Sequence, residues 1–312
     1  MLYIAAFSQK GFLEVPLIFY FKGDNIMWEI LKTIILGIVE GVTEWLPISS
    51  TGHLILVEEF LKLDKSEDFK EMFDVVIQFG AILAVVVIFW KKLWPFGKKD
   101  NAHPLNKSPF GQMVKTDIFM MWFKVLVACI PAAVVGFLLD DWIDEHFYNP
   151  WTVAVALIIF GVAFIIVENW NKSRKPKINT IAELTFNAAL IIGFFQLIAA
   201  VFPGTSRSGA TIVGALLIGV SRTIAAEFTF YLAIPVMFGA SILKLVKFGF
   251  DFTGSELAVL LVGCAVSFIV SVFVIKFLVD YIKKHDFKVF GWYRIVLGVL
   301  VLIYFGAKAI IK

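Results

Sequence analysis

Six uninterrupted apolar runs divide the chain into segments long enough to cross a bilayer. A transmembrane α-helix needs about 20 mainly apolar residues to span the hydrocarbon core. The six runs cover residues 75–90, 119–139, 151–167, 228–246, 257–279 and 292–310. This pattern predicts six transmembrane helices.

Two further apolar runs carry polar residues in their middle. Residues 30–57 are interrupted by two glutamates, a proline, serines and a histidine, and residues 184–220 by a glutamine, a proline and hydroxyl residues around an arginine. Irregular backbone is tolerated at membrane depth only where protein or a water-filled cavity satisfies its polar groups. We expect each run to enter the membrane, turn and return to the same side, and the two together to enclose a polar chamber.

The charges between the runs indicate the two sides of the membrane. Residues 91–115 and 171–177 are rich in lysine, which predicts a cytoplasmic location. The acidic residues 140–150 are expected to form a loop, which lies one crossing from each and must face outward. The same argument places residues 58–74 and 247–256 outside and residues 283–288 inside. The first interrupted run then enters from outside, and the second enters from the cytoplasm.

The two halves of the chain resemble each other. At a constant offset of 156, Gly37, Glu40, Pro47, Ser49 and Ser50 align with Gly193, Gln196, Pro203, Thr205 and Ser206. Each half then holds one re-entrant helical hairpin and three spans, which is typical of an inverted-topology repeat. The predicted fold is an all-α polytopic membrane protein with one domain, residues 27–312, after an extension at residues 1–26. The repeat halves are about 27–170 and 184–312.

Composition and charge exclude other classes of protein. Of the 312 residues, 60% are hydrophobic and 17% are charged, which excludes a water-soluble globule. The net charge of +3 is too small to indicate nucleic-acid binding, so no nucleic-acid partner is expected. Cys129 and Cys264 both lie inside apolar runs, which favours neither a disulfide framework nor a cysteine metal site.

The first interrupted run carries carboxylates, hydroxyls and a histidine within a short stretch. Glu40 and Glu44 lie four residues apart, on one face of a helix. Two buried carboxylates repel each other unless they are paired or hold a cation, and carboxylate oxygens suit Mg²⁺ or Ca²⁺, so both are candidate metal ligands. Glu44 is also a candidate catalytic base. After Pro47 come candidate phosphate ligands and nucleophiles: Ser49, Ser50, Thr51 and His53. Either Ser50 or His53 could attack phosphorus.

The second interrupted run has the composition of an anion-binding loop. Glycines at 204 and 209 let backbone N–H groups approach an anion, and Arg207 offers a planar bidentate fork. The candidate phosphate ligands here are Gly204, Thr205, Ser206, Ser208 and Thr211. The alternative is that Arg207 only forms a structural ion pair with Glu44 or Glu40.

Together the two runs contain what phosphoryl transfer requires. A cation and an arginine would stabilise charge on the phosphate oxygens while a nucleophile attacks in line. Because the site lies in the bilayer, we expect the phosphate to belong to a lipid. The sequence contains neither a Walker lysine motif nor a Rossmann glycine fingerprint, which argues against a soluble nucleotide as substrate.

The motifs Glu40-x-x-x-Glu44 and Pro-Ile-Ser-Ser-Thr-Gly-His53, with Pro-Gly-Thr-Ser-Arg-Ser-x-x-Thr211, resemble the undecaprenyl-diphosphatase family, also known as the bacitracin-resistance proteins. The resemblance covers the chain from about Met27 to its end. It implies hydrolysis of undecaprenyl diphosphate to the monophosphate carrier of peptidoglycan assembly. It further implies a plasma-membrane location, an active site open to the outer side and dependence on a divalent cation. The positions it associates with activity are Glu40, Glu44, Ser50, His53 and Arg207.

Two other classes of membrane protein share parts of this pattern. The membrane phosphatidic-acid phosphatases would require a histidine and then an aspartate soon after Arg207, and the sequence has neither there. A transporter or flippase of an anionic lipid would share the opposed hairpins and the phosphate site. Carriage needs no nucleophile, however, so the set of Glu44, Ser50 and His53 favours an enzyme. Assembly into a homo-oligomer is left open.

Overall fold

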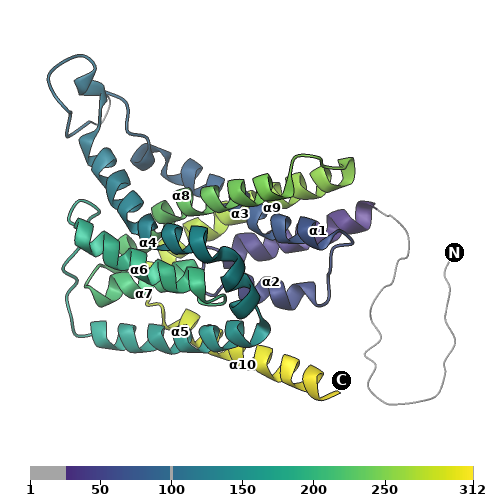
Figure 1. Ribbon diagram of the computed structural model, residues 1–312. Coiled ribbons are helices and arrows are strands. Elements are labelled where there is room, and N and C mark those ends of the chain that lie inside the picture. Colours follow the sequence, from purple (N-terminus) through teal and green to yellow (C-terminus); the bar gives the residue numbers. More distant parts are fainter. Residues whose placement is uncertain (1–25, 99–100, 312) are drawn as a thin grey trace, which may run out of the picture.

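The computed structural model describes residues 26–98 and 101–311, and this part of the chain is helical. The helices lie alongside one another in a bundle, and the loop between α3 and α4 projects from one end of it (Figure 1). Among the described residues there is no β-strand, only isolated bridges. The helices are α1 (Ile26–Thr43), α2 (Ser50–Glu58), α3 (Glu67–Leu93), η1 (Gly111–Met113), α4 (Thr116–Phe147), α5 (Pro150–Asn171), α6 (Phe186–Val201), α7 (Arg207–Leu217), α8 (Arg222–Phe248), α9 (Gly254–Ile282) and α10 (Lys288–Ile311).

Six of these helices are long and apolar enough to cross a membrane, which confirms the six predicted spans. They are α3, the part of α4 at Thr116–Gly136, α5, α8, α9 and α10. Several begin before the apolar run because polar residues cap them. The Ser66 hydroxyl accepts a hydrogen bond from the Phe69 N–H at the start of α3, and a capping box of Thr253 and Glu256 starts α9.

The expectation of a loop at residues 140–150 was wrong, because α4 continues to Phe147. Only two residues separate it from α5, where the Asn149 side chain accepts from the Thr152 N–H and Pro150 occupies the first turn. The helix continues beyond the end of its apolar run, because acidic residues can prolong a helix that has emerged from the membrane. The expected extension, residues 1–26, lies outside the described residues except for Ile26.

Each interrupted apolar run forms two helices joined by a turn. The first run gives α1 and α2 with a turn at residues 44–49, and the second gives α6 and α7 with a turn at residues 202–206. Both returning helices are capped by a serine with positive φ, Ser49 at 76° and Ser206 at 67°. Each serine hydroxyl accepts a hydrogen bond from the N–H three residues later, Gly52 and Gly209. Pro47 and Pro203 both lie in these turns.

The first helix of each interrupted run packs against a helix from the other half of the chain. Helix α1 lies on α9, and α6 lies on α4. Close approach depends on glycine. A Cβ on Gly37 would lie 3.0 Å from the Gly263 carbonyl oxygen, and one on Gly193 would collide with the backbone of Ala128. These contacts fix the depth at which the two turns lie.

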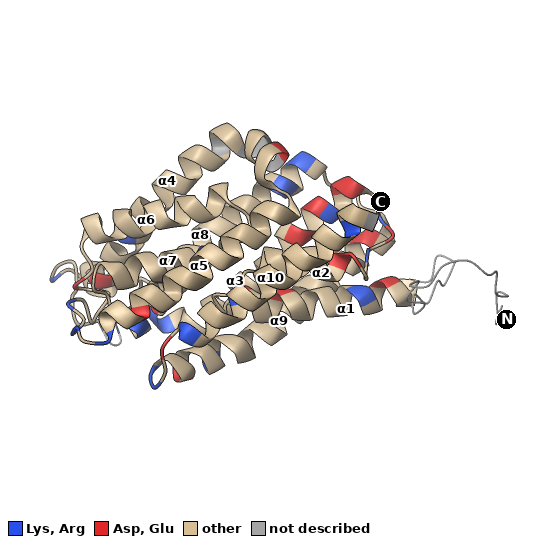
Figure 2. Cartoon of the chain, turned by 90° about the horizontal axis from the view of Figure 1, so that it is seen from below, with Lys and Arg blue, Asp and Glu red and all other residues tan. Residues whose placement is uncertain are grey.

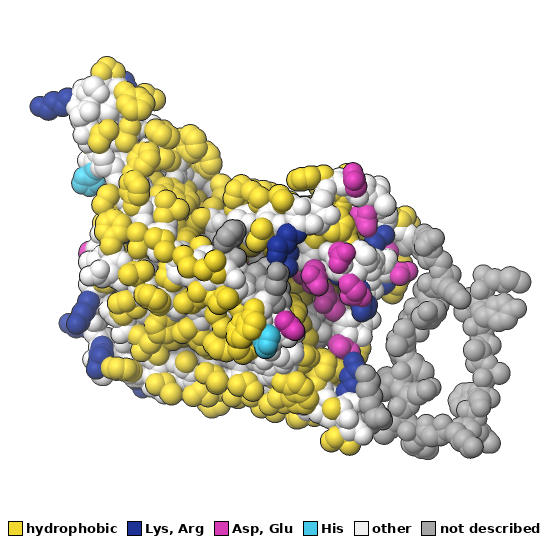
Figure 3. Space-filling view, in the orientation of Figure 1, with side chains coloured by type: hydrophobic (Ala, Val, Ile, Leu, Met, Phe, Trp, Pro, Cys, Tyr) yellow, Lys and Arg dark blue, Asp and Glu magenta, His cyan; other side chains and the backbone are white. Residues whose placement is uncertain are grey.

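The surface matches a membrane protein. Charged residues gather at the two ends of the bundle and are sparse along its middle (Figure 2). Hydrophobic side chains form a broad band across the face shown in Figure 3, with charged groups toward either end. Many large apolar side chains on the spanning helices are exposed, which is expected where lipid surrounds the protein.

Candidate active site

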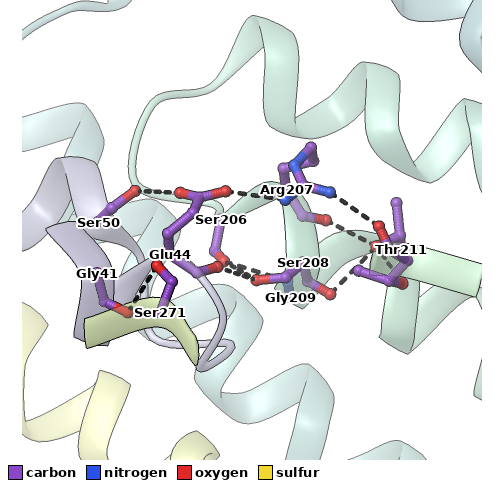
Figure 4. A network of polar contacts seen from close by, with 10 residues as sticks. Gly41, Glu44, Ser50, Ser206, Arg207, Ser208, Gly209, Thr211 and Ser271 are labelled. Atoms are coloured by element: carbon purple, nitrogen blue, oxygen red, sulfur yellow. Dashed lines mark hydrogen bonds and ion pairs between the residues drawn. The ribbon is translucent and has the colours of Figure 1, made fainter. Parts of the chain in front are cut away.

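The turns of the two interrupted runs meet around Glu44 (Figure 4). The Arg207 Nη2 donates to Glu44 Oε1 at 2.8 Å, and the Ser50 hydroxyl donates to Glu44 Oε2 at 2.8 Å. One Glu44 carboxylate oxygen is therefore bonded to α7 and the other to α2. The side chains are 9% exposed for Glu44 and 12% for Arg207, so this ion pair lies in a largely desolvated place.

Backbone and hydroxyl contacts hold the second turn against the first. The Ser208 hydroxyl donates to the Glu44 carbonyl oxygen at 3.2 Å, and Arg207 Nη1 donates to the Thr229 carbonyl of α8 at 3.0 Å. The Thr211 hydroxyl bonds to the Arg207 carbonyl oxygen and to the Thr229 hydroxyl. Arg207 is thus fixed by α8 as well as by Glu44, which pre-orients its guanidinium.

The other predicted phosphate ligands lie in the turns themselves. Ser49 and Ser206 are the caps of α2 and α7, and Ser206 also contacts the Ser208 hydroxyl at 3.1 Å. Thr51 lies in the first turn of α2 and is half-buried. Gly204 has a φ of 90°, a conformation that favours glycine. Thr205 is fully buried, and its hydroxyl has no hydrogen-bond partner in the described part of the chain.

Glu40 lies one helical turn before Glu44 and is fully buried. Neither of its carboxylate oxygens has a hydrogen-bond partner within residues 26–98 and 101–311. It interacts electrostatically with Glu44, Asp74 and Arg207. Gln196 of α6, which the sequence aligned with Glu40, is also buried, and its side-chain oxygen and nitrogen are unpaired over the same ranges.

His53 belongs to the same helix as Ser50 but does not bond to it. Its Nδ1 lies 2.7 Å from the Ser49 carbonyl oxygen, and its Nε2 lies 2.7 Å from the Tyr293 hydroxyl of α10. Because a carbonyl can only accept, Nδ1 carries a proton, and a neutral ring accepts at Nε2 from Tyr293. The structure therefore brings Glu44, Ser50 and Arg207 together and turns His53 toward α10.

Helix α10 contributes two residues that were not predicted from the sequence. Tyr293 bonds to His53, and Arg294 donates to the backbone of both turns. A signal for Arg294 was present, since an arginine inside an apolar span is costly unless it has a specific role. No local motif connected it to the two interrupted runs, which lie far away in the sequence.

Comparisons with known proteins identify relatives of this chain. Residues 33–300 match the family described as bacitracin resistance protein BacA. A protein of Desulfitobacterium hafniense named undecaprenyl-diphosphatase is 64% identical over 283 residues, which are 91% of this chain and 98% of that protein. A protein of the same name from Enterococcus faecalis is 62% identical, covering 88% of this chain and 96% of its own. Another, from Acetivibrio thermocellus, is 60% identical, covering 90% of this chain and 99% of its own.

Proposed function

This chain belongs to the bacitracin resistance protein BacA family, and from that premise we propose that the turns around Glu44 are the site at which it dephosphorylates undecaprenyl diphosphate. The chain is an undecaprenyl-diphosphate phosphatase. It is a multi-pass membrane protein whose substrate is a polyprenyl diphosphate lipid and whose products are undecaprenyl phosphate and inorganic phosphate.

One observation carries the assignment of the site. The Ser50 hydroxyl, the Glu44 carboxylate and the Arg207 guanidinium form a continuous hydrogen-bonded row. A hydroxyl that donates to a carboxylate can lose its proton to it, and a guanidinium binds phosphate in a bidentate manner. When the diphosphate binds, its oxygens replace the Glu44 carboxylate on Arg207, and Glu44 remains the proton acceptor for Ser50.

The reaction then proceeds in two steps. The Ser50 oxygen attacks the terminal phosphorus as its proton passes to Glu44. The bond from that phosphorus to the bridging oxygen breaks, and undecaprenyl phosphate leaves with the electron pair. The departing phosphate takes the proton from Glu44. Water next attacks the phosphorus of the phosphoserine and gives a proton to Glu44. The bond from phosphorus to the Ser50 oxygen breaks, inorganic phosphate is released, and the Ser50 oxygen takes the proton from Glu44. Ser50 is favoured over His53 as nucleophile because both ring nitrogens of His53 are engaged, by Ser49 and Tyr293.

A divalent cation fits the acidic side of this site. Glu40 brings two buried carboxylate oxygens with no partner in the described chain, and such a charge is stable in a membrane only when neutralised or bound to a cation. We propose that Glu40 and Glu44 hold Mg²⁺ or Ca²⁺, which suit carboxylate and phosphate oxygens together. The cation would reduce the negative charge on the diphosphate, while Ser50 and Arg207 keep their roles.

The arrangement of the two interrupted runs supports opposed re-entrant hairpins in an inverted repeat. Helices α1, α2, α6 and α7 are too short or too polar to count among the six spans, yet their turns meet inside the bundle. In each half, the first helix packs on a helix of the other half, α1 on α9 and α6 on α4. A serine-capped helix follows it in both halves, α2 in the first and α7 in the second. On this topology the site opens to the outer side of the plasma membrane.

Nothing in the comparisons favours the transporter or flippase alternative, since the matched relatives carry the phosphatase name. The row of Ser50, Glu44 and Arg207 also argues for chemistry rather than carriage, because transport requires no nucleophile. Three expectations stay predictions: a single domain at residues 27–312, a homo-oligomer and the absence of a nucleic-acid partner.

The test is release of phosphate from undecaprenyl diphosphate in detergent, where no second compartment exists. Ser50→Ala and Glu44→Gln are expected to lower kcat by about 100-fold or more, because each removes a group required for attack. Ser267→Ala is the matched control, since Ser267 is a buried serine like Ser50 but lies on α9 with no partner for its hydroxyl in the described part. It is expected to keep wild-type turnover. Wild-type activity in Ser50→Ala would refute Ser50 as the nucleophile.

A further inference from the structure

Arg294 of α10 joins the two turns of the site through their backbone. Its Nη1 donates to the Pro47 carbonyl oxygen of the first turn at 3.2 Å. Its Nη2 donates to the carbonyl oxygens of Gly204 and Thr205 in the second turn, at 3.0 and 2.7 Å. A longer bond of 3.5 Å runs from Nε to the Leu157 carbonyl of α5. One planar side chain therefore fixes the separation and orientation of both turns.

The guanidinium is fully buried, and within the described residues it forms no ion pair with a carboxylate. A buried charge is costly in a membrane unless it is paired or hydrogen-bonded. Here carbonyl dipoles satisfy the donors but leave the positive charge uncompensated. Arg294 therefore brings a buried positive charge between the two turns, held only by carbonyl oxygens.

The bond to Thr205 also directs a backbone donor. In a trans peptide the carbonyl and the following N–H point in opposite directions. Because Arg294 holds the Thr205 carbonyl, the Ser206 N–H of the same peptide points away from Arg294. No acceptor for this N–H occurs in the described part of the chain. Ser206 is the N-cap residue of α7 and precedes Arg207, so this free donor belongs to the same turn as the residue whose guanidinium pairs with Glu44.

We propose that Arg294 is a positioning residue of the phosphatase reaction, which holds the two turns in register and presents the Ser206 N–H to an oxygen of the substrate's terminal phosphate. The inference rests on the proposed site around Glu44. In the transition state, charge on that oxygen increases, so a fixed N–H donor there stabilises the transition state more than the bound substrate. Arg294 itself touches carbonyl oxygens and does not contact the phosphate.

The test is steady-state hydrolysis of undecaprenyl diphosphate in detergent, together with thermal unfolding of each variant. In Arg294→Lys the charge remains but the fork that spans both turns is lost. We expect kcat to fall on the order of 100-fold, since small displacements of catalytic groups lower the rate by about that factor. KM is expected to change less than about threefold, because the interactions that bind the substrate remain. Arg222→Lys is the matched control. Arg222 pairs with Glu168 near the lysine-rich loop 171–177, and its substitution is expected to leave kcat unchanged.

A second variant moves the guanidinium without removing it. A Cβ on Gly209 would lie 3.0 Å from Arg294 Nη1 and 3.3 Å from the Ser206 Cβ. Gly209→Ala is therefore expected to lower kcat in a folded protein, and it decides the question if Arg294→Lys does not fold. Wild-type kcat in folded Arg294→Lys or Gly209→Ala would overturn the proposal. If Ser50→Ala also keeps wild-type turnover, the proposed site itself fails; if Ser50→Ala is inactive, only the role of Arg294 does.

Discussion

Glu40 and Gln196 hold matching places in the two halves of the chain, and both are buried with unpaired polar atoms in the described structure. Their chemistry differs. An unpartnered amide costs roughly 1–3 kcal/mol, whereas an unpartnered carboxylate costs far more unless it is neutralised. The half with the glutamate therefore carries a group that a cation would stabilise, and the half with the glutamine does not. This asymmetry at one pair of positions distinguishes the half that carries Glu40 and Glu44 from the half that carries Arg207.

Glu40→Gln tests this difference. In the wild type, Mg²⁺ or Ca²⁺ is expected to raise the unfolding temperature relative to chelator, since binding to the folded state alone stabilises it. In Glu40→Gln this rise should disappear, the protein in chelator should be as stable or more stable, and hydrolysis should fall about tenfold or more. The measurements are thermal unfolding in detergent and phosphate release with metal added back. Glu227→Gln is the control, because the Glu227 carboxylate is paired with Lys92 and Tyr231. An unchanged cation response in Glu40→Gln would exclude it as a ligand.

Single residues of the proposed site were predictable where they belong to a local sequence motif. Glu44, Ser50 and Arg207 came from short polar strings inside apolar runs, and the structure places them in contact. The partner of His53 was not predictable, because Tyr293 lies 240 residues away and resembles any interfacial aromatic residue. Long-range hydrogen bonds depend on how helices pack, which no local pattern reports.

At the scale of helices, glycine determines how closely α3 and α9 approach. A Cβ on Gly80 of α3 would collide with the backbone of Cys264 in α9, including its carbonyl oxygen. Backbone cannot yield as a flexible side chain can, so the helices would have to separate. Because α9 also packs on α1, a shift here would propagate to the helix that carries Glu40 and ends beside Glu44.

Gly80→Ala is accordingly expected to destabilise the protein by about 1–3 kcal/mol and to lower activity, although Gly80 is not part of the site. Gly136→Ala in α4 is the matched control, since an added Cβ there meets no atom within 4 Å. It should be neutral, or stabilising by up to about 1 kcal/mol through the helical preference of alanine. Thermal unfolding in detergent compares the two. Equal unfolding temperatures for Gly80→Ala and Gly136→Ala would contradict this prediction, because they would show that α3 and α9 can accommodate the added Cβ at little cost.

The helices themselves followed from hydrophobic length, and their ends did not. All six spans were predicted, yet α3 begins eight residues before the apolar run and α4 ends beyond it, at Phe147. Capping side chains such as Ser66 set these ends, and their effect is independent of hydrophobicity. The pairing of α1 with α9 and of α6 with α4 was also beyond the sequence, because glycines and apolar faces can match several partners.

Across the whole molecule, the distribution of charge defines two ends that the bilayer keeps apart (Figure 2). Lysines at the end of α3, in the described part of the segment that leads to α4 and in residues 171–177 belong to one end. The start of α3 and the end of α2 carry glutamates and aspartates at the other. The preference for positive charge in the cytoplasm then orients all helices at once, including those of the two interrupted runs.

Cysteine labelling tests this orientation. In a background where Cys129 and Cys264 are replaced by alanine, Lys62→Cys, Lys107→Cys and Lys175→Cys each place one thiol at an exposed position. A membrane-impermeant maleimide added to intact cells should label Lys62→Cys, because residues 58–74 are expected outside. Lys107→Cys and Lys175→Cys should react only after the membrane is permeabilised, since both lie in lysine-rich loops. Retained hydrolysis in each variant shows that the labelled protein is folded. Labelling of Lys175→Cys in intact cells would reverse the topology and place the phosphatase site on the cytoplasmic side, where the headgroup of an outward-facing lipid could not reach it.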